Sequence, residues 1–367
     1  MYSYPKYGSK GTSSSSGSTG AQKSRERKVA PQVVVKTEDP GAPFRKASSY
    51  EMDYSNHYIH TGHYPTQVIR NVNFQTDGYP KLQKLKDLKE AQVERHATKP
   101  FGAKVQTDQM ISVLNKWASQ GLQFDVIMIG ALVENQFIVE ILNLLPLFKL
   151  CAKPGFVFIW ATTANIKQLT TLLNGERWNK KFRRSEELVF VPVDDTSEYF
   201  KPGVNDGSHR GEGNGNNESL LGRKQWHCWM CITGTARRST DTDLIHCNVD
   251  TDLQIEPQGG ARVNHNDAVP ETFYKVVENF SNSTRRLHIV PCHTGYKHPV
   301  RVRPGWVVML PDVILDNFDI EAYEQELHSK SYVKFRNTSM NGHQKLVPQY
   351  LVAQTSEIET LRPKSPN

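Results

Sequence analysis

Cysteine is scarce in this chain of 367 residues, and the five cysteines are an odd number. Small secreted domains that depend on disulfide bonds are much richer in cysteine. We therefore expect free thiols, as in a reducing compartment, rather than a disulfide framework. The cysteines are Cys151, Cys228, Cys231, Cys247 and Cys292.

Long apolar runs are also absent. The longest uninterrupted run, Val126 to Val133, has eight residues, whereas a membrane-spanning helix needs about 20. The first ten residues are polar and lack the apolar segment of a secretory signal peptide. We therefore expect no membrane as a partner.

Motifs for a nucleotide or a metal ion are missing as well. The G-x-G spacing of Gly211, Gly213 and Gly215 lies in a polar stretch, without the strand and helix that flank a phosphate-binding loop. Cys228 and Cys231 have a zinc-like spacing, but the surrounding apolar pattern predicts a strand on which they face opposite sides. We therefore expect no metal site.

Positive charge is concentrated near the N-terminus. The net charge is +7, and residues 1–49 hold 9 Lys or Arg against 3 Asp or Glu. This segment has almost no large aliphatic residue, so it cannot bury enough surface to offset the entropy cost of folding. We predict a disordered basic tail at 1–49, a domain at 50–331 with a flexible insertion at 204–220, and a C-terminal extension at 332–367.

Strand and helix patterns alternate in the body of the chain. Apolar segments at Phe124 to Gly130 and Gly155 to Thr162 predict strands buried on both faces, and helical patterns follow them at 134–150 and 165–179. These units predict an α/β fold with a mostly parallel sheet and helices on both faces. Upstream, an aromatic and histidine-rich stretch and an amphipathic helix that opens at Pro80 predict an N-terminal helical/aromatic extension.

The edge of this sheet where a ligand is expected lacks side chains that could bind or react with one. Open α/β sheets bind ligands at the carboxyl ends of their strands. The first buried strand is followed by Gly130, Ala131, Leu132 and Val133, whose side chains offer no acid, base, amide or aromatic ring. We interpret these four residues as a packed apolar turn. Asp125 lies at the opposite end of the strand, where we expect it to cap or pair.

Two arginine pairs are the remaining candidates for binding. Arg237 and Arg238 follow a predicted strand, and Arg285 and Arg286 precede one. A guanidinium group at a strand end can bind a phosphate through two hydrogen bonds. A surface salt bridge or a solvated strand edge is the alternative for each pair, and the sequence leaves it open.

Several segments together resemble a known family. They are FDVIMIG at 124–130, KPGFVFIWA at 153–161, HCWMCITGTARRSTDTDLIHCNVDTDL at 227–253 and TRRLHI at 284–289. The chain is similar in these segments to the N6-adenosine mRNA methyltransferase (MT-A) family, and within it to the non-catalytic methyltransferase-like fourteen branch and fungal karyogamy members. The resemblance implies a Rossmann-like methyltransferase fold.

The resemblance also implies a function without catalysis. Catalytic members carry Asp-Pro-Pro-Trp where this chain has Gly130 to Val133, so the chain resembles a pseudo-methyltransferase whose partner binds S-adenosylmethionine. The implied setting is a nuclear mRNA methyltransferase complex with a catalytic paralogue and other writer subunits. Arg237 and Arg238 match the Lys-Arg of the family's K-R-S-T-D motif and are expected to bind RNA, with Arg285 and Arg286 as further candidates.

The likeness to karyogamy members implies roles in mating and meiosis and leaves a second function open. In this alternative the chain is a transcription cofactor that acts with a DNA-binding pheromone-response factor to induce karyogamy genes. A third alternative is an active methyltransferase. It requires Glu134 or Asn135 to replace the missing acid, and it is the least favoured of the three.

Overall fold

The computed structural model describes residues 80–133, 135, 137–191, 225–236, 253–255, 269–295, 299–340 and 343–362. The predicted tail at 1–49, the aromatic stretch before Pro80 and the predicted insertion at 204–220 lie outside the described residues. All described residues belong to one unit of the chain, Ala47–Asn367.

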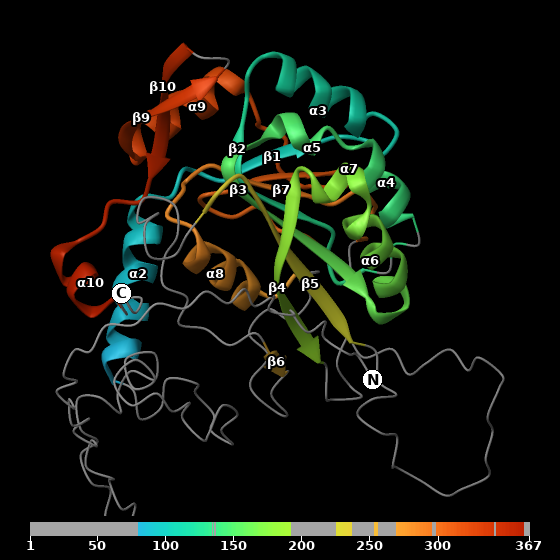
Figure 1. The fold of residues 1–367 in the computed structure, drawn as a ribbon, viewed down its shortest axis with the longest axis horizontal. Helices are drawn as coiled ribbons and strands as arrows, with labels where there is room; N and C mark the ends of the chain where they lie inside the picture. Colours follow the sequence, from blue (N-terminus) through green and yellow to red (C-terminus); the bar gives the residue numbers. More distant parts are fainter. Residues whose placement is uncertain are drawn as a thin grey trace, which may run out of the picture. The chain divides into compact units, whose positions relative to one another are not determined.

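Helices and strands alternate along most of the described chain (Figure 1). The helices are α2 (Pro80–Arg95), α3 (Met110–Ser119), α4 (Ile138–Leu144), α5 (Leu147–Leu150), the 3-10 helix η1 (Thr163–Asn165), α6 (Ile166–Asn174), α7 (Glu176–Asn179), α8 (Glu271–Phe280), α9 (Ile320–Lys330) and α10 (Ser356–Leu361). The strands are β1 (Phe101–Lys104), β2 (Phe124–Ile129), β3 (Cys151–Thr162), β4 (Phe182–Val191), β5 (Trp226–Thr233), β6 (Leu253–Ile255), β7 (Arg286–Ile289), β8 (Val307–Leu310), β9 (Tyr332–Met340) and β10 (His343–Leu351). No described helix is long and apolar enough to cross a membrane.

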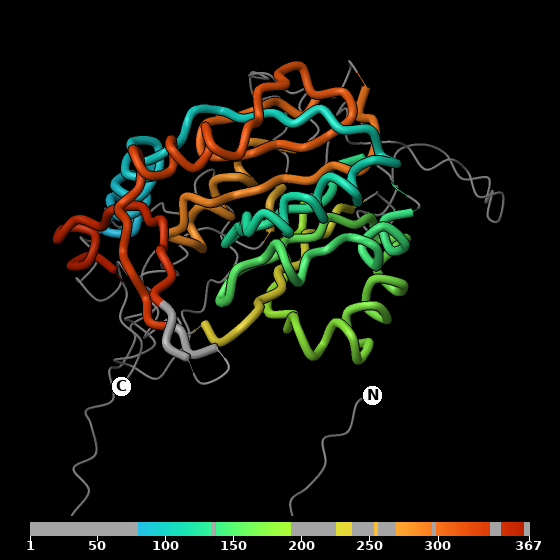
Figure 2. The backbone as a smooth tube through the Cα atoms, turned by 90° about the horizontal axis from the view of Figure 1, so that it is seen from above, coloured from blue at the N-terminus to red at the C-terminus, as the bar shows by residue number. Residues whose placement is uncertain are grey.

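The larger sheet of the described chain has the strand order β1-β8-β7-β2-β3-β5-β4-β6. Neighbours from β1 to β3 are parallel, and among the described strands of this sheet only β5 runs against its neighbours. In Figure 2 the early chain, in cyan, runs beside the late chain, in orange, as the pairing of β1 with β8 requires. The predicted α/β class with a mostly parallel sheet is confirmed.

Side chains of β2 alternate between two cores. Ile127 and Ile129 pack on one face of the sheet with residues of α3 to α7 and α9, and Val126 and Met128 pack on the other face with residues of α8. Figure 1 shows α8 on one side of the sheet and α3 to α7 on the other. A strand covered by helices on both faces is apolar along nearly its whole length. The predicted helices on both faces are therefore confirmed.

The described cysteines are free thiols, as predicted. Cys228 and Cys231 on β5 belong to different cores, so they face opposite sides of the strand. Burial raises the pKa of the Cys231 thiol to about 12, which keeps the thiol protonated and unreactive. No group of metal-ligating side chains occurs within the described part of the chain. Cys247 lies outside it.

The two predicted helices after β2 and β3 are shorter than expected. The pattern at 134–150 predicts one helix, but α4 begins only at Ile138, and Pro146 separates it from α5. Leu145 is extended, with ψ 136°, because a residue before proline avoids the helical conformation. Gly175, which is extended with ψ 146°, divides the second pattern into α6 and α7.

The C-terminal region forms elements that the sequence analysis did not predict. Helix α9 buries Tyr323 and Leu327 and is capped by Asp319, whose carboxylate accepts a hydrogen bond of 3.0 Å from the Ala322 N–H. Strands β9 and β10 then pair as an antiparallel hairpin. Figure 1 shows this hairpin beside α9, on the same side of the picture as α2 and α10.

Candidate functional site

The turn after β2 requires glycine at its first position. Gly130 has φ +88°, in the left-handed region that side chains disfavour. A Cβ atom at Gly130 would lie 3.2 Å from the Cβ of Trp160 on β3. Both the backbone conformation and the space available therefore select glycine.

The remaining residues of the turn are packed. Ala131 and Leu132 are buried in the core formed with α8, and Val133 packs against that core. The predicted packed apolar turn is therefore present. The free volume between this turn and the end of β3 is about 10 Å³, which is room for about one water molecule. Pockets for small ligands have volumes of several hundred Å³, so the described residues at this turn do not fit S-adenosylmethionine.

A buried histidine on the neighbouring strand β7, His288, is hydrogen-bonded to the backbone of this turn. His288 Nε2 donates a hydrogen bond of 2.7 Å to the Gly130 carbonyl, which can only accept. Nδ1 therefore lacks a proton and accepts a bond of 2.7 Å from the Tyr274 hydroxyl. Burial lowers the pKa of His288 to about 4, so the imidazole is neutral at neutral pH. With both nitrogens occupied, His288 positions the turn.

The tyrosine of this chain of hydrogen bonds belongs to a wider polar network. The rings of Tyr274 and Trp306 meet edge to face, with centroids 5.1 Å apart. Trp306 Nε1 donates a bond of 2.7 Å to Glu278, which also pairs with Arg303 at 3.2 Å. Contacts between α8 and the segment before β8 therefore support the turn.

An ion pair occupies the opposite, amino end of β2. Arg285 Nε and one terminal nitrogen each donate a bond of 2.7 Å to the Asp125 carboxylate. Ser283 Oγ donates a third bond of 2.5 Å to the same carboxylate. The guanidinium carbon of Arg285 lies 5.4 Å from the ring centroid of Tyr350. The predicted pairing of Asp125 at the start of the strand is confirmed.

The burial of Arg285 and Arg286 departs from the expectation of a surface phosphate site. The side chain of Arg285 is 11% exposed, and Arg286 is 1% exposed. Burial lowers the pKa of Arg286, and its guanidinium nitrogens have no hydrogen-bond partner within the described chain. The arginine pair leads into a strand that is buried on both faces, so neither guanidinium is offered to a phosphate at the surface. Arg237 and Arg238 lie outside the described residues, and RNA binding by them stays a prediction.

Of the two polar residues that could replace a catalytic acid, Glu134 and Asn135, the structure describes only Asn135. Asn135 lies before α4, and not within a helix, and its side-chain oxygen accepts a bond of 3.0 Å from the Phe137 N–H. Glu134 lies outside the described residues. Asn135 therefore contributes a hydrogen bond to the segment that leads into α4.

The fold and the packed edge define a class: an α/β domain with a methyltransferase-like fold whose first central strand ends in an apolar turn. Comparison with known proteins makes the class specific. Residues 131–309 match the MT-A70 family. The karyogamy protein KAR4 of Saccharomyces cerevisiae is 50% identical over 337 residues, which cover 91% of each chain. The chain belongs to the MT-A70 family.

Two further relatives carry the name of a subunit. The N(6)-adenosine-methyltransferase non-catalytic subunit METTL14 of Xenopus tropicalis is 29% identical over 330 residues, which cover 86% of this chain and 62% of the frog protein. The N6-adenosine-methyltransferase non-catalytic subunit MTB of Arabidopsis thaliana is 29% identical over 241 residues, which cover 60% of this chain and 28% of the plant protein. The similarity to the family stated from sequence motifs is therefore confirmed.

Proposed function

We propose that this chain is a non-catalytic subunit of a nuclear complex that methylates adenosine N6 in mRNA, in which it supports a catalytic paralogue and RNA binding. Its similarity to METTL14 and MTB, both named as non-catalytic subunits, supports this proposal. Its similarity to a karyogamy protein supports roles in mating and meiosis.

The observation that carries the proposal is the turn after β2. General acid or base chemistry needs a titratable group within reach of the reacting atoms. Gly130 to Val133 supply none, and Ala131 and Leu132 are committed to the core. We therefore assign S-adenosylmethionine and the catalytic groups to the partner and describe this chain as a pseudo-methyltransferase.

The test is methyl transfer to an adenosine-containing RNA by a co-expressed, co-purified catalytic paralogue, with and without this chain. We expect activity to require the chain and to be lost with Arg238→Glu while the two proteins still co-purify. Lys167→Glu, an exposed position on α6, is the matched control and leaves activity unchanged. Methylation by this chain alone, or activity that is indifferent to it, contradicts the proposal.

The similarity to a karyogamy protein also favours a second function, a transcription cofactor for a DNA-binding pheromone-response factor. In this case the basic segment 1–49 adds non-specific attraction to DNA. Salt-sensitive DNA binding that disappears when 1–49 is deleted, together with no association with a catalytic paralogue, favours this function over the first.

A further inference from the structure

The β9–β10 hairpin is only partly built into the domain. At its base, Val333 and Tyr350 pack against the core that contains Ile127 and Ile129 of β2. Further along, Phe335 is 62% exposed and Leu346 is 61% exposed. A two-stranded hairpin has little stability of its own in water. Beyond its base, the hairpin therefore presents exposed side chains to the solvent.

Charge on the hairpin is of one sign. Residues 332–351 contain Lys334, Arg336 and Lys345 and no Asp or Glu. Positions two apart on a strand share a face, so Tyr332, Lys334 and Arg336 lie on the same face of β9. Lys345 pairs with Thr338 in the register, which places this position on that face too. We call this face, with Tyr332, Lys334, Arg336 and position 345, the basic-aromatic face.

The opposite face of the hairpin has a different character. It carries Val333, Phe335 and Tyr350, with Pro348 paired to Phe335. Tyr350 also bonds to His328 of α9 at 2.9 Å, so α9 lies on this side of the hairpin.

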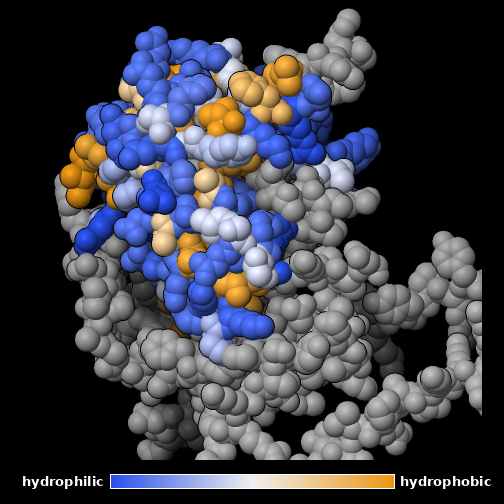
Figure 3. All heavy atoms as spheres, turned by 90° about the vertical axis from the view of Figure 1, so that its left-hand side faces the viewer, coloured by the Kyte–Doolittle hydropathy of each residue, from blue (hydrophilic) through white to orange (hydrophobic). Residues whose placement is uncertain are grey.

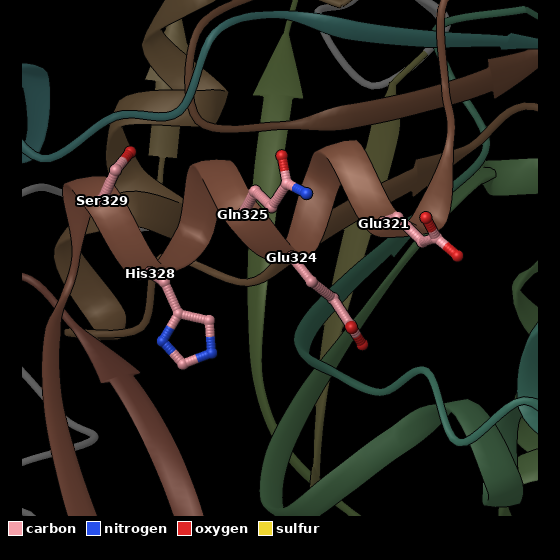
Figure 4. Close-up of a pocket in the computed structure, with 5 residues that line it drawn as sticks. All are labelled: Glu321, Glu324, Gln325, His328 and Ser329. Atoms are coloured by element: carbon pink, nitrogen blue, oxygen red, sulfur yellow. The ribbon is translucent and has the colours of Figure 1, made fainter.

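Helix α9, which lies on the side of the hairpin that carries Tyr350, bears acidic side chains. Glu321, Glu324 and His328 line a shallow, open surface of α9, and in Figure 4 the side chains of Glu324 and His328 point to the same side of the helix. Carboxylates repel a polyanion, whereas the lysines and the arginine attract one. The hairpin thus separates an acidic side from a basic side.

The aromatic residue on the basic side specifies the ligand further. Tyr332 is 55% exposed and alternates with Lys334 and Arg336, which are also exposed. Single-stranded nucleic acids are bound by cationic groups along the backbone together with aromatic rings on which bases stack. In Figure 3 the hydrophobic residues of this side of the domain form separate areas in a mostly hydrophilic surface. A single large apolar patch, as at many protein interfaces, is not seen among the described residues there.

We propose that the basic-aromatic face of the hairpin binds single-stranded RNA, with Tyr332 stacking on a base and Lys334 and Arg336 contacting phosphates. This inference deepens the proposed function and rests on it for the identity of the strand as RNA. It adds a contact surface distinct from Arg237 and Arg238.

The test is binding of the full-length chain to a fluorescent, unstructured RNA 20-mer at several salt concentrations. Each phosphate contact contributes about 0.7 to the slope of log K against log salt for a single strand. We expect the double variant Lys334→Gln, Arg336→Gln to reduce that slope by about 1.4. The control, Lys116→Gln with Lys167→Gln, removes the same charge from exposed positions on α3 and α6 and leaves the slope unchanged.

The stacking contact has a separate readout. Tyr332→Leu is expected to weaken RNA binding about 5- to 100-fold with no change of slope, and Tyr332→Phe to retain binding. Phe335→Ser changes the opposite face and is expected to bind RNA as the wild type does. Circular dichroism of each variant establishes that the fold is kept.

Four results would overturn the inference. The first is an equal slope change in the double variant and the lysine control. The second is a loss of RNA binding with Phe335→Ser but not with Tyr332→Leu. The third is competition by polyglutamate as effective as that by RNA, which would indicate an acidic protein partner. The fourth is tighter binding to DNA of the same sequence. Co-purification with the catalytic paralogue is measured separately, so failure of the proposed function and failure of the hairpin site are distinguishable.

Discussion

Arg285 and Asp125 are joined by two hydrogen bonds of 2.7 Å across neighbouring segments of the sheet. Asp125 belongs to β2 and Arg285 directly precedes β7, so the pair ties the amino ends of these strands together. Two buried charges compensate each other, and removal of one leaves the other without a partner in a medium of low dielectric constant. The pair is therefore a sensitive point of the fold.

Asp125→Asn is expected to lower the free energy of unfolding by about 3 to 5 kcal/mol, because the Arg285 charge stays buried without its counter-ion. Urea unfolding measures the loss. The control is Lys84→Ala, which removes an exposed ion pair with Glu357 and is expected to cost less than about 1 kcal/mol. A loss with Asp125→Asn no larger than that of the control would contradict this role.

The stability of the domain is expected to depend on pH through His288. Burial lowers the pKa of this histidine from 6.5 to about 4. Between these values the unfolded chain binds the proton more readily than the folded one, so stability falls as the pH falls through this window, by about 3 kcal/mol in total.

His288→Gln keeps a donor for the Gly130 carbonyl and an acceptor for Tyr274 without a titratable group. We expect wild type to lose stability relative to this variant as the pH is lowered from 7 to 4, measured by urea unfolding at one-unit steps. Parallel pH profiles for the two proteins would show that His288 does not titrate as described.

Gly130→Ala is expected to destabilise the domain more than Gly121→Ala. The two glycines have nearly equal φ values, +88° and +86°. Only at Gly130 does a Cβ meet a neighbour, Trp160, whereas nothing lies within 4 Å at Gly121. Gly121→Ala should cost about 1 to 2 kcal/mol for the left-handed conformation, and thermal unfolding should show a larger loss for Gly130→Ala. Equal losses would rule out crowding by Trp160.

A chain that ends at Ser331 is expected to lose cooperative unfolding. The truncation removes Tyr350 and Val352, whose backbone groups bond to Thr284 at 3.0 Å and to Asn282 at 2.7 Å. It also uncovers the guanidinium of Arg285. A chain that ends at Arg362 keeps these contacts and is the control. If the chain that ends at Ser331 unfolds with the same midpoint as the control, the hairpin is dispensable to the fold.

The central strands β2 and β3 could be predicted from sequence because burial on both faces makes them almost continuously apolar. Helix α2 could also be predicted, from Pro80 at its start and from the spacing of Leu82 and Leu85, which are buried. Leu88 shares the helical spacing of these leucines but is only half-buried, whereas its neighbour Lys89 is 1% exposed. Its ammonium donates a bond of 3.2 Å to the Asn279 carbonyl, a partner that no local pattern specifies.

Other elements could not be predicted from the sequence, or their signal in it was overlooked. Strand β1 has four residues, too few for a periodic pattern. The hairpin had an available signal, since Asn341-Gly342 is a dipeptide that favours two-residue hairpin turns. The burial of Arg285 depends on Asp125, 160 positions earlier in the chain, so only the tertiary structure distinguishes it from a surface phosphate ligand.

The position of Tyr350 over Arg285 bears on how the chain is made. Ribosomes add about 5 to 20 residues per second, so roughly 10 to 50 seconds pass between the synthesis of Asp125 and that of Tyr350. Arg285 and β7 follow Asp125 by 160 residues, so the ion pair can form only after roughly the first 8 to 32 seconds of that interval, and Tyr350 covers it later still. The domain therefore completes its fold only after Tyr350 has been made and can pack over Arg285.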